Sequence, residues 1–247
     1  MDNLENPLIQ YTNMKKKYYE DYLNPSLAVD IVVFTIEDNS LKVLTIERDN
    51  DPFKGLPALP GGFVREGENT EMAAVRILKD KAGVSNVYIE QLYTFDELGR
   101  DPRGPVFSVT YFALAPREKI LNLDSKEYSE NSRVQKTKPH FISTAKLPKM
   151  AFDHNKILNY SIERLQSKLE YTNVSYSLLG NEFTFTELQN VYETILNKKM
   201  DKRNFRKKIL QLGLIEETDK ISKGGRQRPA RLYKFKTRKL QSLQKFF

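Results

Sequence analysis

Four side chains in two separated segments have the chemistry to bind a phosphate-containing ligand. Arg100, Asp101 and Arg103 lie together in a loop between two apolar segments, and Arg48 follows an earlier apolar segment. Guanidinium groups donate paired hydrogen bonds to diphosphate oxygens, and loops carried by a rigid sheet often hold binding residues. We therefore predict that these four residues contribute to a ligand pocket. The alternative is a solvated turn whose arginines contact water.

Positive charge is concentrated in the C-terminal quarter of the chain. All 247 residues together carry a net charge of +8, whereas residues 181–247 alone hold 17 Lys and Arg against 7 Asp and Glu, a net charge of +10. A compact basic segment beside a near-neutral one is typical of a nucleic-acid-binding module. A basic tail that only aids solubility is the alternative.

The pattern of this basic segment predicts two helices and a hairpin. Thr184 and Glu187 fit a capping box that starts a helix over about residues 185–197. A second helix over 202–213 and two strands around a Gly-Gly turn over 214–235 complete a winged helix. The residues predicted to contact double-stranded DNA are Lys202, Arg203, Asn204, Arg206 and Lys207 on the second helix, and Arg226, Arg228 and Arg231 on the hairpin. A basic, solvated helix without a partner is the alternative.

The preceding part of the chain predicts the strands that would carry the ligand loop. Residues 27–37 and 41–47 are rich in Val, Ile and Leu and are separated by turn residues, which predicts a hairpin. Further strands are expected over 87–95 and 106–115. Residues 116–150 are polar and predict no regular element.

Two helices are predicted beside these strands. The first is capped by Asn69 or Thr70, is ended by Gly83 in the left-handed conformation, and carries an apolar stripe of Met72, Val75, Leu78 and Ala82. The second starts at an Asp153 cap and carries a stripe of Leu158, Ile162, Leu165 and Leu169. This second stripe must be buried, either in the core or at a dimer seam.

Composition excludes several classes of site. The absence of cysteine excludes disulfides and thiolate zinc sites, and the two histidines, His140 and His154, lie far apart and are expected at the surface or at a helix cap. The N-terminus lacks the features of a signal peptide. The apolar run 27–34 is interrupted by Asp30 and is shorter than the roughly 20 residues that a membrane span needs. We therefore expect a cytoplasmic protein without a membrane partner.

The spacing of residues 61–84 resembles the Nudix box, a loop, helix and loop with fixed glycine, glutamate and arginine positions. The scaffold positions of that box are filled here by Gly62, Glu68, Arg76, Leu78, Gly83 and Val84. This resemblance places Gly62 and Glu68 among the expected ligand-binding residues.

The metal positions of the box are altered. Nudix hydrolases carry three glutamates on one helix face, where this chain has Ile77, Asp80 and Lys81. Mg²⁺ is held mainly by carboxylates and phosphates, so one carboxylate beside an ammonium should hold it poorly. The resemblance therefore implies a Nudix fold kept for binding, without metal-dependent hydrolysis. An unusual metal site built from Glu68, Glu71 and Asp80 is the alternative.

With its C-terminal segment included, the chain resembles the Nudix-related transcriptional regulators over about residues 25–238. The motifs that carry this resemblance are the altered box, RDPRG at 100–104, and the segments 147–154, 199–208 and 228–233. It implies an α+β fold, with a Nudix α/β/α sandwich over residues 1–175 and a winged helix-turn-helix domain over residues 176–247.

The same resemblance implies a function. A member of this family would be a homodimeric repressor of NAD-metabolism genes that ADP-ribose releases from its operator, with no cofactor required. A sugar such as arabinose is an alternative effector. The alternative function is a metal-dependent Nudix hydrolase of ADP-ribose or of a nucleoside diphosphate derivative.

Overall fold

The computed structural model describes residues 22–120, 139–222 and 229–243. Its elements are, in chain order, β1 (Ser26–Glu37), β2 (Ser40–Glu47), β3 (Pro57–Ala58), β4 (Gly61–Phe63), α2 (Thr70–Ala82), β5 (Tyr88–Phe95), β6 (Val106–Leu114), η1 (Arg117–Lys119), β7 (His140–Ser143), α3 (His154–Tyr171), η4 (Val174–Leu178), β8 (Phe183–Thr184), α4 (Phe185–Leu196), α5 (Lys202–Gln211), β9 (Ile215–Ile221) and β10 (Arg231–Phe235). No helix within these ranges is both long and apolar enough to span a bilayer.

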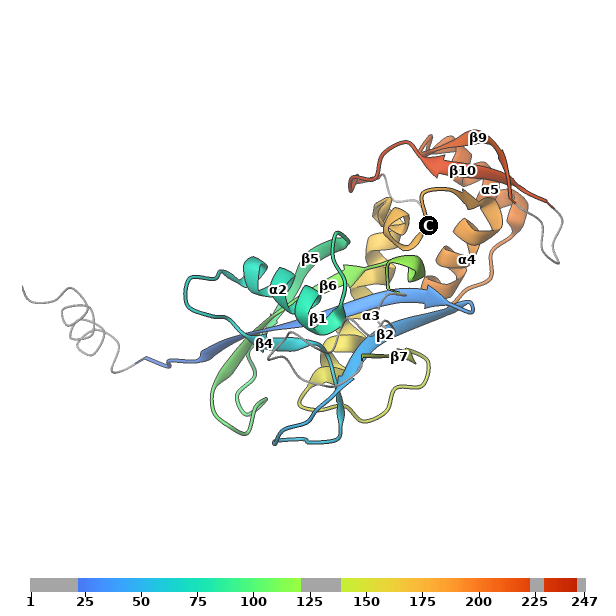
Figure 1. The fold of residues 1–247 in the computed structure, drawn as a ribbon. Helices are drawn as coiled ribbons and strands as arrows, with labels where there is room; N and C mark the ends of the chain where they lie inside the picture. Colours follow the sequence, from blue (N-terminus) through green and yellow to red (C-terminus); the bar gives the residue numbers. More distant parts are fainter. Residues whose placement is uncertain (1–21, 121–138, 223–228, 244–247) are drawn as a thin grey trace, which may run out of the picture.

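The first half of the chain forms a mixed sheet (Figure 1). Its strands lie in the order β3-β2-β1-β6-β5, β4 pairs with β1, and β7 pairs with β2. Strands β1 and β2 form the predicted hairpin, and Asp38 and Asn39 at its tip have positive φ angles. Strand β6 runs parallel to β1 from Ser26 opposite Val106 to Phe34 opposite Leu114. Strand β7 lies in the segment for which no regular element was predicted, so that prediction was wrong.

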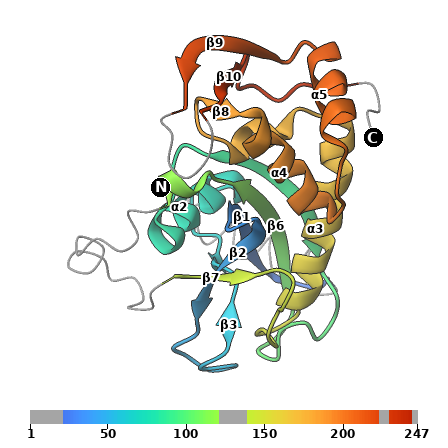
Figure 2. The same ribbon diagram turned by 90° about the vertical axis from the view of Figure 1, so that its right-hand side faces the viewer.

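Helices cover both faces of this sheet, as Figures 1 and 2 show. Successive residues of β1 point to opposite faces, because the side-chain period of a strand is two. Ile31 and Val33 pack in one cluster with α2, whereas Val32 and Phe34 pack in a second cluster with α3. The predicted α/β/α sandwich is confirmed.

The buried face of α2 differs from the predicted stripe. Asn69 caps the helix and Gly83 ends it at a φ of 62°, as predicted. However, Met72 and Val75 are each 54% exposed, and the buried residues are Ala73, Ala74, Ile77, Leu78 and Ala82. The stripe is therefore confirmed at Leu78 and Ala82 and wrong at Met72 and Val75, because Ala73 and Ala74 allow the start of the helix to lie close to the sheet.

The C-terminal part forms the predicted winged helix. The Thr184 and Glu187 capping box starts α4, and Asp201 caps α5. Strands β9 and β10 form the hairpin, and β8 adds a third strand that the sequence did not indicate. The predicted DNA contacts Arg226 and Arg228 lie outside the described residues.

Helix α3 joins the two parts of the molecule. Leu158, Leu165 and Leu169 of its predicted stripe are buried in a core that continues into α4, and Ile162 packs against that core. Gln166 also donates a 2.9 Å hydrogen bond to the Ile195 carbonyl oxygen of α4. The stripe thus lies within the core. The domain boundary between residues 175 and 176 falls inside η4 and stays a prediction.

Candidate functional site

A cavity of about 230 Å³ opens between β1, the loop after β2, the start of α3 and the loop before β6. Its lining includes five of the predicted ligand residues, namely Arg48, Gly62, Arg100, Asp101 and Arg103. Residues that were not predicted for the ligand site also line it, namely Asp30, Lys81, Phe152 and His154. The structure therefore brings the loop of residues 100–103 and Arg48 into one pocket, as their chemistry suggested.

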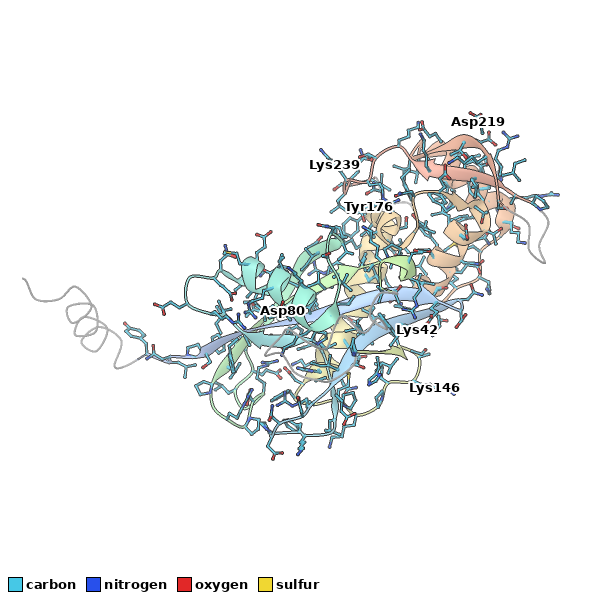
Figure 3. All side chains as sticks on the ribbon, viewed as in Figure 1. Lys42, Asp80, Lys146, Tyr176, Asp219 and Lys239 are labelled. Atoms are coloured by element: carbon cyan, nitrogen blue, oxygen red, sulfur yellow. The ribbon has the colours of Figure 1, made fainter. Side chains whose placement is uncertain are left out.

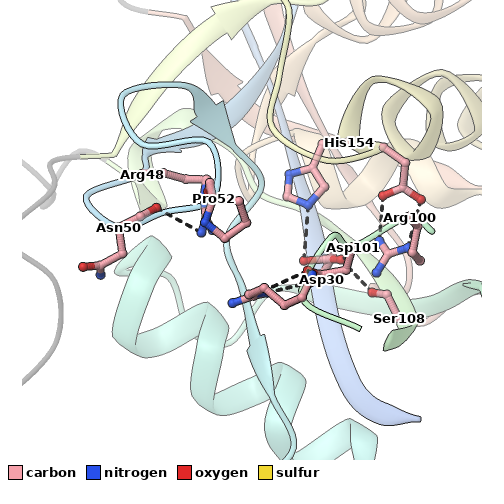
Figure 4. A network of polar contacts seen from close by, with 10 residues as sticks. Asp30, Arg48, Asn50, Pro52, Arg100, Asp101, Ser108 and His154 are labelled. Atoms are coloured by element: carbon pink, nitrogen blue, oxygen red, sulfur yellow. Dashed lines mark hydrogen bonds and ion pairs between the residues drawn. The ribbon is translucent and has the colours of Figure 1, made fainter. Parts of the chain in front are cut away.

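Asp30 lies at the centre of a buried polar network (Figure 4). One carboxylate oxygen accepts a 2.6 Å hydrogen bond from the Ser108 hydroxyl, and the other lies 3.7 Å from His154 Nε2. A β-carbon added to Gly61 would lie 2.1 Å from the Asp30 carboxylate, so any larger residue there would displace that carboxylate. The Asp30 carboxylate therefore contacts β6 through Ser108, the start of α3 through His154, and the box at Gly61.

His154 is buried, contrary to the expectation of a surface or capping residue. Its Nδ1 accepts a 2.9 Å hydrogen bond from the Leu59 amide. Burial lowers the pKa of His154, although the charge of Asp30 opposes this. The ring is therefore neutral, and its Nε2 proton faces Asp30, because Nδ1 is occupied as an acceptor.

The two arginines of the loop are held by carboxylates. Arg100 donates two hydrogen bonds, of 3.0 and 2.7 Å, to Asp153 and lies 3.5 Å from Asp30. Arg103 donates hydrogen bonds of 2.9 and 2.6 Å to Asp101. Burial alone would raise the pKa of Asp101, but the hydrogen bonds from Arg103 make the net shift downward. Both arginines line the pocket with their charges already balanced.

Asp153 was predicted to cap α3. It does stand at the N-cap position, yet its side chain makes no capping hydrogen bond. Its carboxylate instead binds Arg100, so the expected cap is replaced by a contact between α3 and the pocket loop.

Arg48 and Lys81 direct their hydrogen bonds to main-chain carbonyl oxygens instead. Arg48 donates hydrogen bonds to the carbonyl oxygens of Pro52 and Asn50, and its guanidinium lies 4.7 Å from the centre of the Phe152 ring. Lys81 Nζ donates a 2.6 Å hydrogen bond to the Gly61 carbonyl oxygen. Burial lowers the pKa of both groups. These two cations give the pocket its capacity to bind an anion.

Glu68 does not line the pocket, although the Nudix resemblance placed it among the ligand residues. It accepts hydrogen bonds of 2.5 and 2.8 Å from Arg76 and one of 3.0 Å from the Arg65 amide. The Arg76 contacts lower the pKa of Glu68 to about 2. Glu68 therefore holds the loop of the box to its helix.

The three metal positions of the box do not fit a divalent cation. Ile77 is fully buried in the core beneath Gly62. Asp80, on α2 in Figure 3, does not line the pocket. Lys81 does line it and places an ammonium there. Within the described ranges, no three His, Asp or Glu side chains are grouped to hold a metal ion.

Helix α5 presents a basic surface beside the hairpin. Lys202, Arg203, Asn204 and Lys207 are exposed on it, whereas Phe205 and Ile209 are buried against α4 and the small sheet. Helix α5 thus offers an exposed basic surface to the phosphates and base edges of a nucleic acid.

Two of the predicted DNA-contact residues are engaged within the protein. Arg206 donates a 2.8 Å hydrogen bond to the Tyr233 hydroxyl, and its guanidinium lies 4.6 Å from the centre of the Phe185 ring. Arg231 forms an exposed ion pair with Glu217 at 2.8 Å. Arg206 therefore packs α5 against the hairpin, whatever else it contacts.

One sequence signal pointed to the central residue of the pocket. Asp30 interrupts an otherwise apolar strand, and a charge in such a position is buried only when it is paired. The Nudix resemblance placed Lys81 at a metal position of the box. No local signal indicated that His154 would face the same cavity, because its contacts join segments far apart in the chain.

Comparison with known proteins assigns both parts of the chain. The NUDIX domain family matches residues 25–160, and the NrtR DNA-binding winged helix domain family matches residues 175–235. The ADPR responsive transcriptional repressor NtrR of Acinetobacter baylyi is 37% identical over 221 residues, covering 87% of this chain and 84% of the relative. An ADP-ribose pyrophosphatase of Methanocaldococcus jannaschii is 38% identical over 151 residues, covering 61% and 80%.

A solved structure matches both parts together. Shewanella oneidensis NrtR, crystallised with a 27-mer DNA, is similar with a TM-score of 0.73 and 36% identity, covering 85% of this chain and 93% of that one. The similarity extends through the sandwich and the winged helix. The chain therefore belongs to the NrtR-type Nudix-related transcriptional regulators.

Proposed function

We propose that the protein is a repressor of NAD-metabolism genes that binds its operator through the winged helix and leaves it when ADP-ribose fills the pocket. The observation that carries this proposal is the similarity to DNA-bound Shewanella oneidensis NrtR over 85% of the chain. The Acinetobacter baylyi relative is named as responsive to ADPR, which supports the same effector. Such a protein works beside the chromosome, in agreement with the expected cytoplasmic location.

The pocket favours a charged effector over a neutral sugar. Arg48 and Lys81 direct cationic groups into it, and Phe152 offers an aromatic face next to Arg48. A diphosphate gains charge-assisted hydrogen bonds from such groups, whereas arabinose offers them only neutral acceptors. ADP-ribose is therefore the effector that this chemistry supports best.

We further propose that α5 enters the major groove of the operator. Exposed Lys202, Arg203, Asn204 and Lys207 would contact phosphates and base edges there. A homodimer would place two such helices on a pseudo-palindromic site whose half-sites are about 10 base pairs, or a multiple of that, apart.

Helix α3 is the element that we propose couples the pocket to the winged helix. Its N-terminal Asp153 binds Arg100 of the pocket loop, and its Gln166 binds α4. A ligand that shifts the start of α3 would therefore shift α4 relative to the sheet. The effector must then prefer the DNA-incompetent arrangement by the same free energy that it removes from DNA binding.

A metal-dependent hydrolase is the second candidate, and the similarity to an ADP-ribose pyrophosphatase favours it. The residues at the metal positions argue against it, because Ile77 is buried, Asp80 lies outside the pocket and Lys81 brings a positive charge into it. We propose that the chain does not hydrolyse its ligand.

Fluorescence anisotropy tests the regulator proposal. The purified protein is titrated onto labelled DNA from upstream of its own and neighbouring genes, at fixed salt because phosphate contacts make affinity salt-dependent. ADP-ribose is then added to the complex, with arabinose as the matched control. Specific binding that ADP-ribose abolishes supports both the repressor and its effector.

Other outcomes separate the candidates. Specific binding that only arabinose relieves would replace the effector and keep the repressor. Absence of preference over random DNA, together with Mg²⁺-dependent release of AMP from ADP-ribose, would return the hydrolase to first place.

A further inference from the structure

Lys81 occupies an unusual place for a lysine, because it emerges from the last turn of α2 into the pocket instead of into solvent. Its ammonium is fixed by the 2.6 Å hydrogen bond to the Gly61 carbonyl oxygen. An ammonium has three N–H donors. The Gly61 contact uses one of them, so further donors are available to a group that enters the cavity.

The charges of the pocket distinguish Lys81 and Arg48 from the other cations. Arg100 is bound by Asp153, and Arg103 by Asp101, so each of these guanidinium groups has its counter-ion. Arg48 and Lys81 contact main-chain carbonyl oxygens. Their hydrogen bonds thus go to neutral acceptors, so both charges can attract an anionic ligand, although the Asp30 and Asp51 carboxylates line the same cavity.

These two cations also act on each other. Burial is the largest cause that lowers the pKa of Lys81, the charge of Asp30 opposes this shift, and the charge of Arg48 adds a smaller lowering. Placing an anion between like charges in a partly dry cavity removes this repulsion and strengthens each hydrogen bond. The cavity therefore stabilises a bound phosphate more than a neutral group.

We infer that the Lys81 ammonium binds the diphosphate of the effector directly, in the place where Nudix hydrolases use a divalent cation, so that this protein binds ADP-ribose without metal. The inference rests on the proposed function for the identity of the ligand. It follows from the misfit of the metal positions, since an ammonium inside the pocket repels Mg²⁺ and itself supplies positive charge. The Lys81 ammonium would thus supply the positive charge that a bound Mg²⁺ supplies in Nudix hydrolases.

Metal dependence of the unaltered protein provides the first test. Isothermal titration calorimetry with ADP-ribose is run in EDTA and in excess Mg²⁺. We expect dissociation constants that agree within about twofold, because no metal bridges the protein and the ligand. Binding that needs Mg²⁺ would overturn the inference, and this measurement does not depend on whether any variant folds.

Variants provide the second test. Lys81→Met keeps the length of the side chain and removes its charge, and Lys79→Met is the matched control because Lys79 is exposed in the same helical turn. Loss of a charge-assisted contact should weaken ADP-ribose binding by at least about tenfold in Lys81→Met, against less than about twofold in Lys79→Met. Thermal unfolding of each variant verifies that it is folded. Equal affinities of the two folded variants would refute the role of Lys81.

Inorganic pyrophosphate separates this inference from the proposed function. If the unaltered protein binds pyrophosphate in a Lys81-dependent way but does not bind ADP-ribose, the diphosphate site stands and the proposed effector is wrong. If it binds neither ligand, the inference is overturned as well.

Discussion

Replacing Asp153 by Ala tests the buried ion pair that joins the pocket to α3. The Asp153 carboxylate accepts two hydrogen bonds from Arg100, and the side chains of Arg100 and Asp153 are 5% and 14% exposed. Removing one partner of a buried pair costs about 3–5 kcal/mol, because the other charge remains in a dry site. Asp30 still lies 3.5 Å from Arg100 and offsets part of this loss. We therefore expect a destabilisation of about 2–3 kcal/mol.

The same region offers a matched control. Glu97 forms an ion pair with Lys156 of α3, but these side chains are 67% and 53% exposed. An exposed pair of this kind contributes less than about 1 kcal/mol. In urea unfolding monitored by circular dichroism, Asp153→Ala should lose far more stability than Glu97→Ala. The unfolding temperature of Asp153→Ala should fall by about 5–10 °C, since 1 kcal/mol corresponds to about 2–4 °C in a chain of this length. Equal losses in the two variants would show that the Arg100 pair is not dry and would refute this reasoning.

Three further predictions concern α2, α5 and α4. Ile77→Ala should lower the free energy of unfolding by about 2–5 kcal/mol, whereas Met72→Ala should change it by less than about 0.5 kcal/mol. Similar urea midpoints for the two variants would refute the buried face assigned to α2. Arg203→Ala should weaken operator binding and reduce the slope of log affinity against log salt concentration by about 1. The affinity for ADP-ribose, measured by calorimetry, should not change. Undiminished operator affinity would show that Arg203 is not part of the DNA interface. Hydrogen bonds from Lys199 and from a backbone amide lower the pKa of Glu193 from 4.5 to about 2, so its stabilising effect is present above pH 4.5 and is lost as the pH falls toward 2. The stability difference between the unaltered protein and Glu193→Gln should therefore be constant near neutral pH and shrink in acid, and a difference that stays constant in acid would contradict this.

Local signals in the sequence were sufficient for most of the elements and for the class of function. The capping box at Thr184 and Glu187, the Asp201 cap and the left-handed Gly83 lie within a few residues of the helix ends that they fix. The spacing of the altered Nudix box and the basic helix after Asp201 indicated the family in the same way. Such features are predictable because the interacting groups are neighbours in the chain.

The tertiary structure decided how the charged groups of the pocket are paired. The sequence placed Arg100 and Arg103 among the ligand residues, but it did not show that Asp153, 53 residues from Arg100, would take the bonds of that guanidinium. Nor did it show that Lys81 would reach the Gly61 carbonyl oxygen. Which carboxylate neutralises which cation depends on the packing of α2 and α3 against opposite faces of the sheet. Those contacts form only when the chain folds, because they join residues that are far apart in the sequence.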